Sequence, residues 1–154
     1  MSQTEQTYVL VVEDDPAQQR LMQEALKETG RDVKLVAATS GAEAMALMQR
    51  ERPNLILLDL SLPAMDGREV LKALKRDSRL NYIPIVVFTA SSAEHDIVSA
   101  YSAGANCYLQ KPPDFPELVR CMSALLNFWT DTASLPPPDY ADRRGRRMAE
   151  MWSK

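Results

Sequence analysis

The sequence contains five short apolar runs that are continuous and do not alternate with polar residues. They span residues 8–12, 33–38, 55–58, 83–88 and 107–109. Continuous runs of this length are typical of strands that are buried on both faces, as in a parallel sheet. Amphipathic segments of helical length follow the runs, so strand and helix alternate five times. This order predicts an α/β fold, a doubly wound (βα)5 arrangement with right-handed crossovers.

Helix starts are indicated by residues whose side chains accept hydrogen bonds from the first free backbone N–H groups. The expected caps are Asp15, Ser40, Asp66, Ser91 and Asp114. Ser40, Ser91 and Asp114 are each followed three positions later by Glu, which is the capping-box pattern or its Asp variant. The last helix is the clearest, because its apolar residues from Phe115 to Trp129 follow the spacing of one helical stripe.

A chain of 154 residues suits a single domain, and its net charge of −3 makes it slightly acidic. Its two cysteines, Cys107 and Cys121, favour a reduced cytosolic protein over a secreted one. The N-terminus lacks the basic-then-apolar pattern of a signal peptide. No apolar run approaches the ~18 residues of a membrane span. We therefore expect a cytoplasmic protein with no membrane contact.

Composition divides the chain into an N-terminal arm, one folded domain and a C-terminal tail, over residues 1–7, 8–129 and 130–154. In the tail, Leu135–Pro138 cannot continue a helix and is expected to be extended. The residues from Tyr140 onward are basic, and Met148, Met151 and Trp152 fit one short amphipathic turn. The tail is too short for an independent DNA-binding or output domain, so no nucleic-acid partner is expected.

Polar side chains that can carry chemistry follow four of the five apolar runs. Glu13 and Asp14 follow the first run, Asp59 the third and Thr89 the fourth, and Lys111 lies just beyond the fifth. In an open parallel sheet, ligands bind at the edge where the carboxyl ends of the strands meet. The sequence therefore brings carboxylates, a hydroxyl and an ammonium to one edge of the domain.

Carboxylates gathered at one edge indicate either raised pKa values or a bound cation, because like charges disfavour mutual ionisation. Mg²⁺ prefers oxygen ligands and takes one or two protein carboxylates beside waters and phosphate oxygens. Asp59 then remains able to act as a nucleophile, as in aspartyl-phosphate chemistry, with Thr89 and Lys111 neutralising the phosphoryl oxygens. An acid at a helix start can equally be a cap, which is our interpretation of Asp15. The prediction depends on the whole set.

Four segments resemble the signature segments of the receiver domain of response regulators in bacterial two-component systems. They are Val11–Asp15, Leu57–Gly67, Val87–Ala90 and Lys111–Pro112. The resemblance covers about Tyr8 to Trp129. It implies the flavodoxin-like fold of that family, with a five-stranded parallel sheet in the order 2-1-3-4-5.

The resemblance also implies a phosphoacceptor role for Asp59, with a histidine kinase as the phosphoryl donor. Mg²⁺ would be held by the carboxylates of Glu13, Asp14 and Asp59. The backbone carbonyl of Ser61 would complete the protein ligands. Thr89 would hydrogen-bond the phosphoryl group, and Lys111 would pair with it. Such a protein is a phosphoacceptor that assists its own phosphorylation and dephosphorylation, and is not otherwise an enzyme.

Further roles implied by the same resemblance concern switching. Thr89 and Tyr108 would be the switch pair, in which the tyrosine moves as the threonine is drawn to the phosphoryl group. The Lys111–Pro112 peptide bond would be cis, as in the family. Ser61 and Ser91 occupy positions where the family tunes the hydrolysis of its acyl phosphate.

The segment Asn127–Trp129, followed by Leu135 and Pro136, resembles stand-alone regulators that partner phytochrome-type histidine kinases. This similarity implies an extended tail and a homodimer built from the fourth helix, fifth strand and fifth helix. The main hypothesis is accordingly a single-domain response regulator in a phosphorelay, which is phosphorylated on Asp59 by a bacteriophytochrome-type histidine kinase.

Two alternatives to a phosphorylated switch are weighed. A receiver-like interaction module that is never phosphorylated has no need of the complete set of acids, hydroxyl and ammonium. A phosphohydrolase similar to haloacid dehalogenases would place a second acid two residues after the nucleophile, where this chain has Ser61. The scattered glycines also form no phosphate-binding loop for a nucleotide binder.

Overall fold

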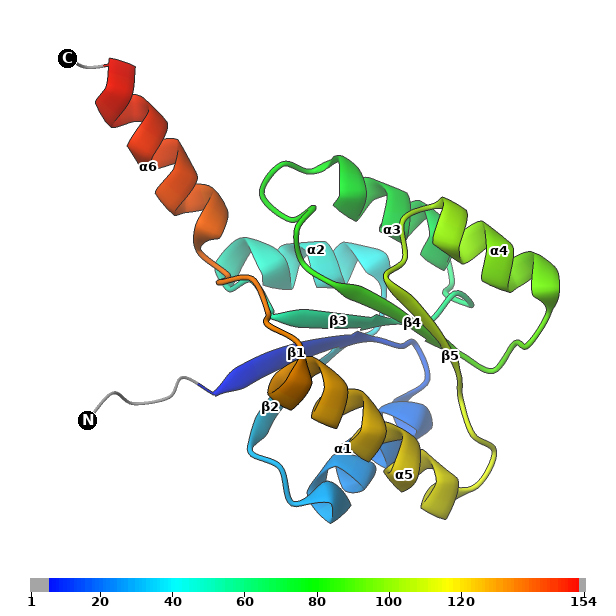
Figure 1. Ribbon diagram of the computed structural model, residues 1–154. Helices are drawn as coiled ribbons and strands as arrows, with labels where there is room; N and C mark the ends of the chain where they lie inside the picture. The colour runs from blue at the N-terminus through cyan, green and yellow to red at the C-terminus, as the bar shows by residue number, and fades with distance from the viewer. Residues whose placement is uncertain (1–5, 153–154) are drawn as a thin grey trace.

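The computed structural model describes residues 6–152 of the chain, apart from the side chains of residues 148–150. Five strands form one parallel sheet in the order β2-β1-β3-β4-β5 (Figure 1). In chain order they are β1 (Thr7–Val12), β2 (Val33–Ala38), β3 (Leu55–Leu58), β4 (Ile85–Thr89) and β5 (Cys107–Gln110). The predicted parallel sheet and its strand order are confirmed.

Helices alternate with the strands and cover both faces of the sheet (Figure 1). They are α1 (Pro16–Thr29), α2 (Gly41–Arg50), α3 (Gly67–Arg76), α4 (Glu94–Ser102) and α5 (Phe115–Leu126). Helices α1 and α5 lie on one face, and α2, α3 and α4 lie on the other. No helix in the described part of the chain is both long and apolar enough to cross a bilayer.

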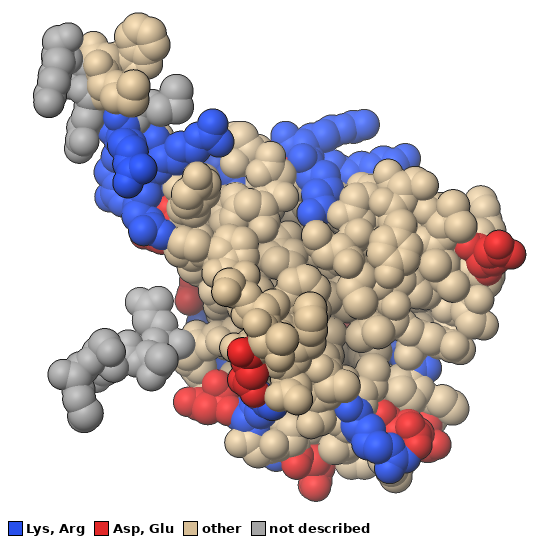
Figure 2. Space-filling model, in the orientation of Figure 1, with Lys and Arg blue, Asp and Glu red and all other residues tan. Residues whose placement is uncertain are grey.

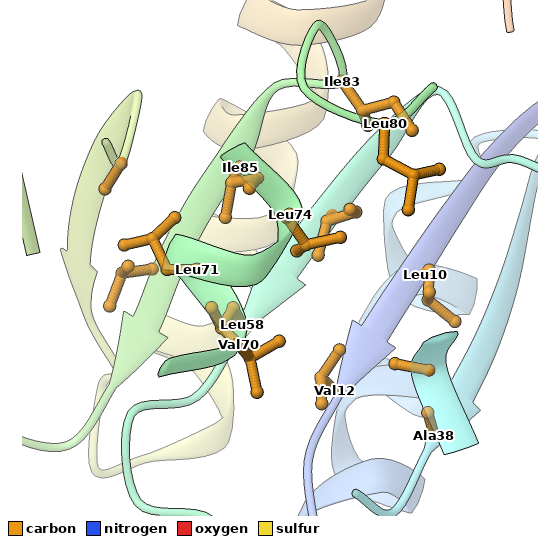
Figure 3. Close-up of a cluster of buried hydrophobic side chains, with 14 of the residues drawn as sticks. Leu10, Val12, Ala38, Leu58, Val70, Leu71, Leu74, Leu80, Ile83 and Ile85 are labelled. Atoms are coloured by element: carbon orange, nitrogen blue, oxygen red, sulfur yellow. The ribbon is translucent and has the colours of Figure 1, made fainter. Parts of the chain in front are cut away.

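Two apolar clusters, one on each face of the sheet, form the core. In β1, Leu10 and Val12 belong to the cluster beneath α2, α3 and α4, whereas Val9 and Val11 belong to the cluster beneath α1 and α5. Figure 3 shows the first cluster, to which Leu74 of α3 contributes. Because both faces of the strands are buried, their sequences are continuously apolar. The residues that follow the strands then meet at one edge.

Four of the five expected caps accept hydrogen bonds from the first turn of a helix. They are Asp15, Ser40, Asp66 and Asp114. The expectation for the fourth helix is wrong, because α4 begins at Glu94 after Ala93, which has no side-chain cap. The hydroxyl of Ser91 is instead a donor to the carboxylate of Asp96, at 2.5 Å.

The fourth strand begins two residues later than the apolar run indicates. Ile83 is buried, but its N–H donates to the carbonyl of Leu80 in a turn. Pro84 follows and has no N–H to donate to a neighbouring strand. The ladder between β3 and β4 therefore begins at Ile85.

The helical stripe that ends at Trp129 changes character after Leu126. Residues Asn127–Thr132 form a π-helix instead of continuing α5. Its turn is contacted by the guanidinium of Arg31, whose two amino groups donate to Asn127 at 2.8 Å and to Asp131 at 2.9 Å. These contacts connect the end of α5 to the turn between α1 and β2.

The C-terminal segment contains a longer helix than the single amphipathic turn expected there. Helix α6 (Tyr140–Trp152) has 13 residues and points away from the sheet (Figure 1). Its first turn is anchored to the body by Asp142, which forms ion pairs with Arg52 and Arg79, and by the edge-to-face contact of Tyr140 with Tyr82. Figure 2 shows positively charged side chains gathered along the rest of α6.

Candidate functional site at the carboxyl ends of the strands

Three carboxylates converge where β1 and β3 end. Glu13, Asp14 and Asp59 each offer an oxygen, and these oxygens all lie within 4.8 Å of one another. The sheet sets their positions, because the N–H of Glu13 donates to Ala38 and the N–H of Asp59 donates to Val12. Glu13 is 2% exposed and Asp59 is 8% exposed, whereas Asp14 is open to solvent.

Lys111 supplies the positive charge that faces these acids. Its Nζ atom lies 2.9 Å from Oδ2 of Asp59 and is also hydrogen-bonded to the carboxylate of Glu13. The backbone of the lysine is held by β4, since its N–H donates to the carbonyl of Thr89 at 2.7 Å. The predicted meeting of the acids with the lysine is thus what the structure has.

Burial and pairing have opposing effects on the charges of this cluster. Burial raises the pKa of Glu13, although the hydrogen bond from Lys111 opposes that rise. Burial alone would lower the pKa of Lys111, but its hydrogen bonds to Glu13 and Asp59 outweigh burial and raise that pKa. The ammonium of Lys111 is therefore charged at neutral pH, and it neutralises only part of the negative charge of the three carboxylates.

The loop after β3 fits closely around Asp59. The N–H of Ser61 donates to Oδ1 of Asp59 at 3.0 Å, so the two carboxylate oxygens have separate partners. Gly67 packs against the same loop, and a Cβ on it would lie 2.5 Å from the carbonyl oxygen of Asp59 and 2.6 Å from Cα of Leu60. The loop thus requires glycine at this position. Its place in the signature segment was visible in the sequence, but this packing role was not.

An open pocket of about 640 Å³ surrounds the acids and is lined also by Asp15, Ser61, Gln110 and Pro112. A second pocket of about 390 Å³ lies beside it, and Thr89 and Ser91 line this one together with Ser61. Thr89 is buried at the end of β4. Ser61 borders both pockets, so the acids and the threonine face adjoining spaces.

Tyr108 connects β5 to the loop after β4. Its hydroxyl donates to the carbonyl of Ser91 at 2.9 Å, and its N–H donates to the hydroxyl of Tyr101 in α4 at 3.1 Å. The side chain is half-buried. Its place beside the loop that follows Thr89 is the one a switch pair needs, and the switching role of both residues stays a prediction.

The Lys111–Pro112 peptide bond is trans, as are the other peptide bonds of the described residues, so the prediction of a cis bond is wrong. The trans isomer before proline is intrinsically favoured by about 0.5–1 kcal/mol. With the trans bond, the lysine already reaches the carboxylates of both Glu13 and Asp59.

Arg68 is a charged residue near the site that the sequence did not single out. It lies in the first turn of α3 and is hydrogen-bonded to Asp66, Asp96 and Ser99. Together with Thr89 it lines the second pocket. Its partners in α4 follow it by about thirty residues, so no local spacing marks the cluster.

The donor set suits a divalent metal ion. Carboxylate oxygens are hard ligands, and two or three of them that meet at an open pocket leave positions for water and for a ligand's oxygens. Two of the three acids are buried, where unbalanced negative charge is costly. The arrangement thus forms a divalent metal site beside Asp59, whose Oδ1 faces a backbone N–H.

Comparisons with known proteins show which family has this arrangement of residues. Residues 9–123 match the model of the response regulator receiver domain. The chain is 42% identical over 135 residues to the response regulator Rcp1 of Synechocystis sp., with 83% of this chain and 92% of that protein covered.

Solved structures are similar over the same part of the chain. The Mn²⁺-bound form of response regulator Rcp1 has a TM-score of 0.77 and 41% identity, with 85% of this chain and 99% of that chain covered. The phosphorylated cyanobacterial phytochrome response regulator RcpA has a TM-score of 0.80 and 40% identity, with 86% and 100% covered. With the sheet order, the acidic cluster and these matches in agreement, the chain belongs to the response regulator receiver domain family.

Proposed function

We propose that the protein is a phosphoacceptor switch in which Asp59 accepts a phosphoryl group from a histidine kinase in the presence of Mg²⁺. The observation that carries the proposal is the meeting of three carboxylate oxygens within 4.8 Å, with Lys111 Nζ at 2.9 Å from Asp59. A carboxylate is a competent nucleophile toward phosphorus, and phosphoryl transfer depends mainly on alignment and charge neutralisation.

Each residue has a part in that step. An oxygen of Asp59 forms the new O–P bond while the N–P bond of the donor phosphohistidine breaks, and the released imidazole takes a proton from solvent. Glu13, Asp14 and Asp59 would hold Mg²⁺, which would neutralise phosphoryl oxygens. Lys111 supplies a further positive charge, and the hydroxyl of Thr89 hydrogen-bonds a phosphoryl oxygen. The carbonyl of Ser61 completes the proposed metal ligands.

The test is phosphorylation by acetyl phosphate with Mg²⁺, followed by intact-protein mass spectrometry. We expect one added phosphoryl group on the wild type and none on Asp59→Asn. Asp66→Asn is the matched control, because Asp66 is an exposed acid in the same loop. Equal labelling of Asp59→Asn and the wild type would reject Asp59 as the acceptor. Omitting Mg²⁺ from the wild-type reaction tests the metal requirement.

A phytochrome-type histidine kinase is the proposed donor. The support is the similarity to RcpA, which is named a phytochrome response regulator. We expect such a kinase to transfer to this protein faster than unrelated kinases do in a phosphotransfer panel. Equal rates across the panel would reject this partner while leaving the phosphoacceptor role in place.

A homodimer through α4, β5 and α5 is the proposed assembly. This face exposes apolar side chains, with Val98 57% and Tyr101 49% exposed in α4, and Phe128 51% exposed just beyond α5. Exposed apolar surface of this kind favours a partner. Sedimentation of the wild type and of Val98→Asp tests the assembly, and we expect the variant to be monomeric at concentrations where the wild type is dimeric.

A further inference from the structure

The guanidinium of Arg68 crosses from α3 to α4. Its Nε donates to the hydroxyl of Ser99 at 2.7 Å, and one amino group forms an ion pair with Asp96. The other amino group lies 3.2 Å from Asp66, the cap of α3. Within residues 6–152, every side-chain hydrogen bond between α3 and α4 comes from Arg68. The arginine is therefore the polar connection between these two helices.

Asp96 carries the connection into the loop after β4. Its Oδ2 accepts a hydrogen bond from the hydroxyl of Ser91 at 2.5 Å, while its Oδ1 accepts one from the guanidinium of Arg68. The carbonyl of Ser91 accepts the hydroxyl of Tyr108 at 2.9 Å. We call this series of contacts, from Arg68 through Asp96 and Ser91 to Tyr108, the Arg68 chain.

The Arg68 chain holds a helix start that has no cap of its own. Ala93 precedes α4 and provides no side-chain hydrogen bond. The loop before it is held instead by Ser91, whose hydroxyl oxygen accepts from the N–H of Ala93 and whose proton goes to Asp96. The loop geometry thus depends on a residue of another helix, Arg68.

The Arg68 chain also borders the space beside the phosphoacceptor. Arg68, Asp96 and Ser91 line the same pocket of about 390 Å³ as Thr89 and Ser61. Ser61 N–H is hydrogen-bonded to Asp59, so this pocket adjoins the carboxylate that would carry the phosphoryl group. A change in the Arg68 chain therefore changes the surroundings of that group.

We propose that Arg68 is a positioning residue that acts through Asp96 on Ser91 and thereby sets how long a phosphoryl group stays on Asp59. This inference rests on the proposed function. In hydrolysis, a water oxygen bonds to phosphorus, the bond between phosphorus and the Asp59 oxygen breaks, and inorganic phosphate and a proton leave. While the hydroxyl of Ser91 donates its hydrogen bond to Asp96, it is not available to that water, and the loop that follows Thr89 keeps its position beside the phosphoryl group.

The experiment measures the decay of phosphorylated protein. The wild type and its variants are phosphorylated with acetyl phosphate and Mg²⁺, freed of donor by desalting, and followed by intact-protein mass. We expect Arg68→Met and Asp96→Asn to lose the phosphoryl group about 3- to 10-fold faster than the wild type, the rate equivalent of roughly one hydrogen bond. Arg68→Lys retains the charge with fewer donors, so its decay should be intermediate.

A double variant distinguishes the Arg68 chain from two unrelated effects. If Arg68 acts through Asp96, a variant that carries both Arg68→Met and Asp96→Asn should lose its phosphoryl group no faster than the faster single variant. Independent effects of the two substitutions would instead multiply. Lys72→Met is the matched control, because Lys72 is exposed one turn later on α3, and its decay should equal that of the wild type. Thermal unfolding of each variant shows whether the fold is intact.

The outcomes separate the two proposals. Wild-type decay in both Arg68→Met and Asp96→Asn, or equal acceleration in Lys72→Met, overturns the role of Arg68 and leaves Asp59 as the acceptor. A loss of thermal stability with unchanged decay assigns Arg68 a structural role only, which also overturns the inference. If the wild type takes up no phosphoryl group, the proposed function fails and this inference fails with it.

Discussion

Nζ of Lys111 lies 2.9 Å from Oδ2 of Asp59, so the lysine engages a carboxylate that also belongs to the metal site. The ammonium and a divalent cation therefore compete for the same negative charge. We predict that Lys111→Met binds Mg²⁺ about 3- to 10-fold more tightly than the wild type, because the carboxylates no longer have the lysine ammonium beside the metal ion. Titration calorimetry measures the change.

The same substitution should slow phosphorylation by acetyl phosphate, since one of the charges that neutralise the phosphoryl oxygens is lost. The control is Lys27→Met in the last turn of α1, where the side chain is largely exposed and pairs with Glu24. Unchanged Mg²⁺ affinity in Lys111→Met would contradict the competition.

Gly67→Ala should damage the site through the backbone of its loop. The new Cβ would lie 2.5 Å from the carbonyl oxygen of Asp59, and backbone cannot move aside as a flexible side chain can. We expect a loss of about 1–3 kcal/mol in the free energy of unfolding, together with weaker Mg²⁺ binding. Denaturant unfolding and calorimetry measure the two effects.

The matched glycine is Gly145, where a Cβ meets nothing within 4 Å. Because Gly145 lies within α6, Gly145→Ala should increase helicity at the C-terminus by circular dichroism and leave Mg²⁺ binding unchanged. Equal stability of both alanine variants would show that the loop around Asp59 is more adaptable than its contacts indicate.

Arg52→Met should release the first turn of α6. The arginine side chain is 11% exposed and its guanidinium is paired with Asp142. Losing it leaves Asp142 with the longer contact to Arg79, at 3.6 Å. We expect amide hydrogen exchange of residues 140–147 to quicken about 5- to 10-fold, the equivalent of one hydrogen bond of ordinary strength. The control is Arg50→Met, because Arg50 is an exposed residue of α2, and residues 140–147 of this variant should exchange as they do in the wild type.

The anchor of α6 should also depend on pH. The hydrogen bond from Arg52 is the main cause that lowers the pKa of Asp142. A carboxyl whose pKa is lowered in the folded state contributes stability above its unfolded value of about 3.9, and that contribution is lost as the pH falls through the folded value. The protection of residues 140–147 against exchange, relative to the intrinsic rate at each pH, should therefore fall below about pH 4 in the wild type. Arg52→Met should show less of this dependence.

Lys75→Met should stabilise the protein at neutral pH. Burial lowers the pKa of Lys75, because desolvation disfavours its ammonium. The unfolded chain then binds more protons between the folded pKa and the unfolded value of about 10.4, so the wild type gains stability as the pH rises through that window. We expect a thermal midpoint about 2 °C higher for the variant at pH 7, a difference that shrinks in alkali. Lys72→Met serves as the exposed control.

Much of the site could be predicted because parallel strands share one edge for their carboxyl ends. Asp59 and Lys111 are 52 residues apart, yet each follows a recognisable apolar run, and the sheet brings them together. The caps Asp15 and Ser40 depend on hydrogen bonds within three residues, so local sequence suffices for them. Short-range chemistry and sheet topology are both visible in a pattern of residue types.

Features that depend on distant side chains were not predictable in that way. Ser91 has the spacing of a capping box, but its hydroxyl donates a hydrogen bond to the carboxylate of Asp96. The same carboxylate accepts a hydrogen bond from Arg68, which belongs to another helix. The trans isomer of the Lys111–Pro112 bond likewise differs from the cis isomer that the family resemblance implies. Helix α6 is longer than its composition indicates, and its first turn is held through Asp142 by two arginines of the folded body that are distant in sequence.

The route of the chain after α5 has a consequence for the order of folding. Residues Leu135–Pro138 leave the layer of α1 and α5, and Tyr82 beyond α3 donates its hydroxyl proton to the carbonyl of Pro138. Tyr82 contacts Pro138 and Arg52 contacts Asp142, and contacts between residues so far apart along the chain are slow to form because they close long loops. We therefore expect residues 135–142 to attach late in folding, so that their attachment would report a completed sheet and both of its helical layers.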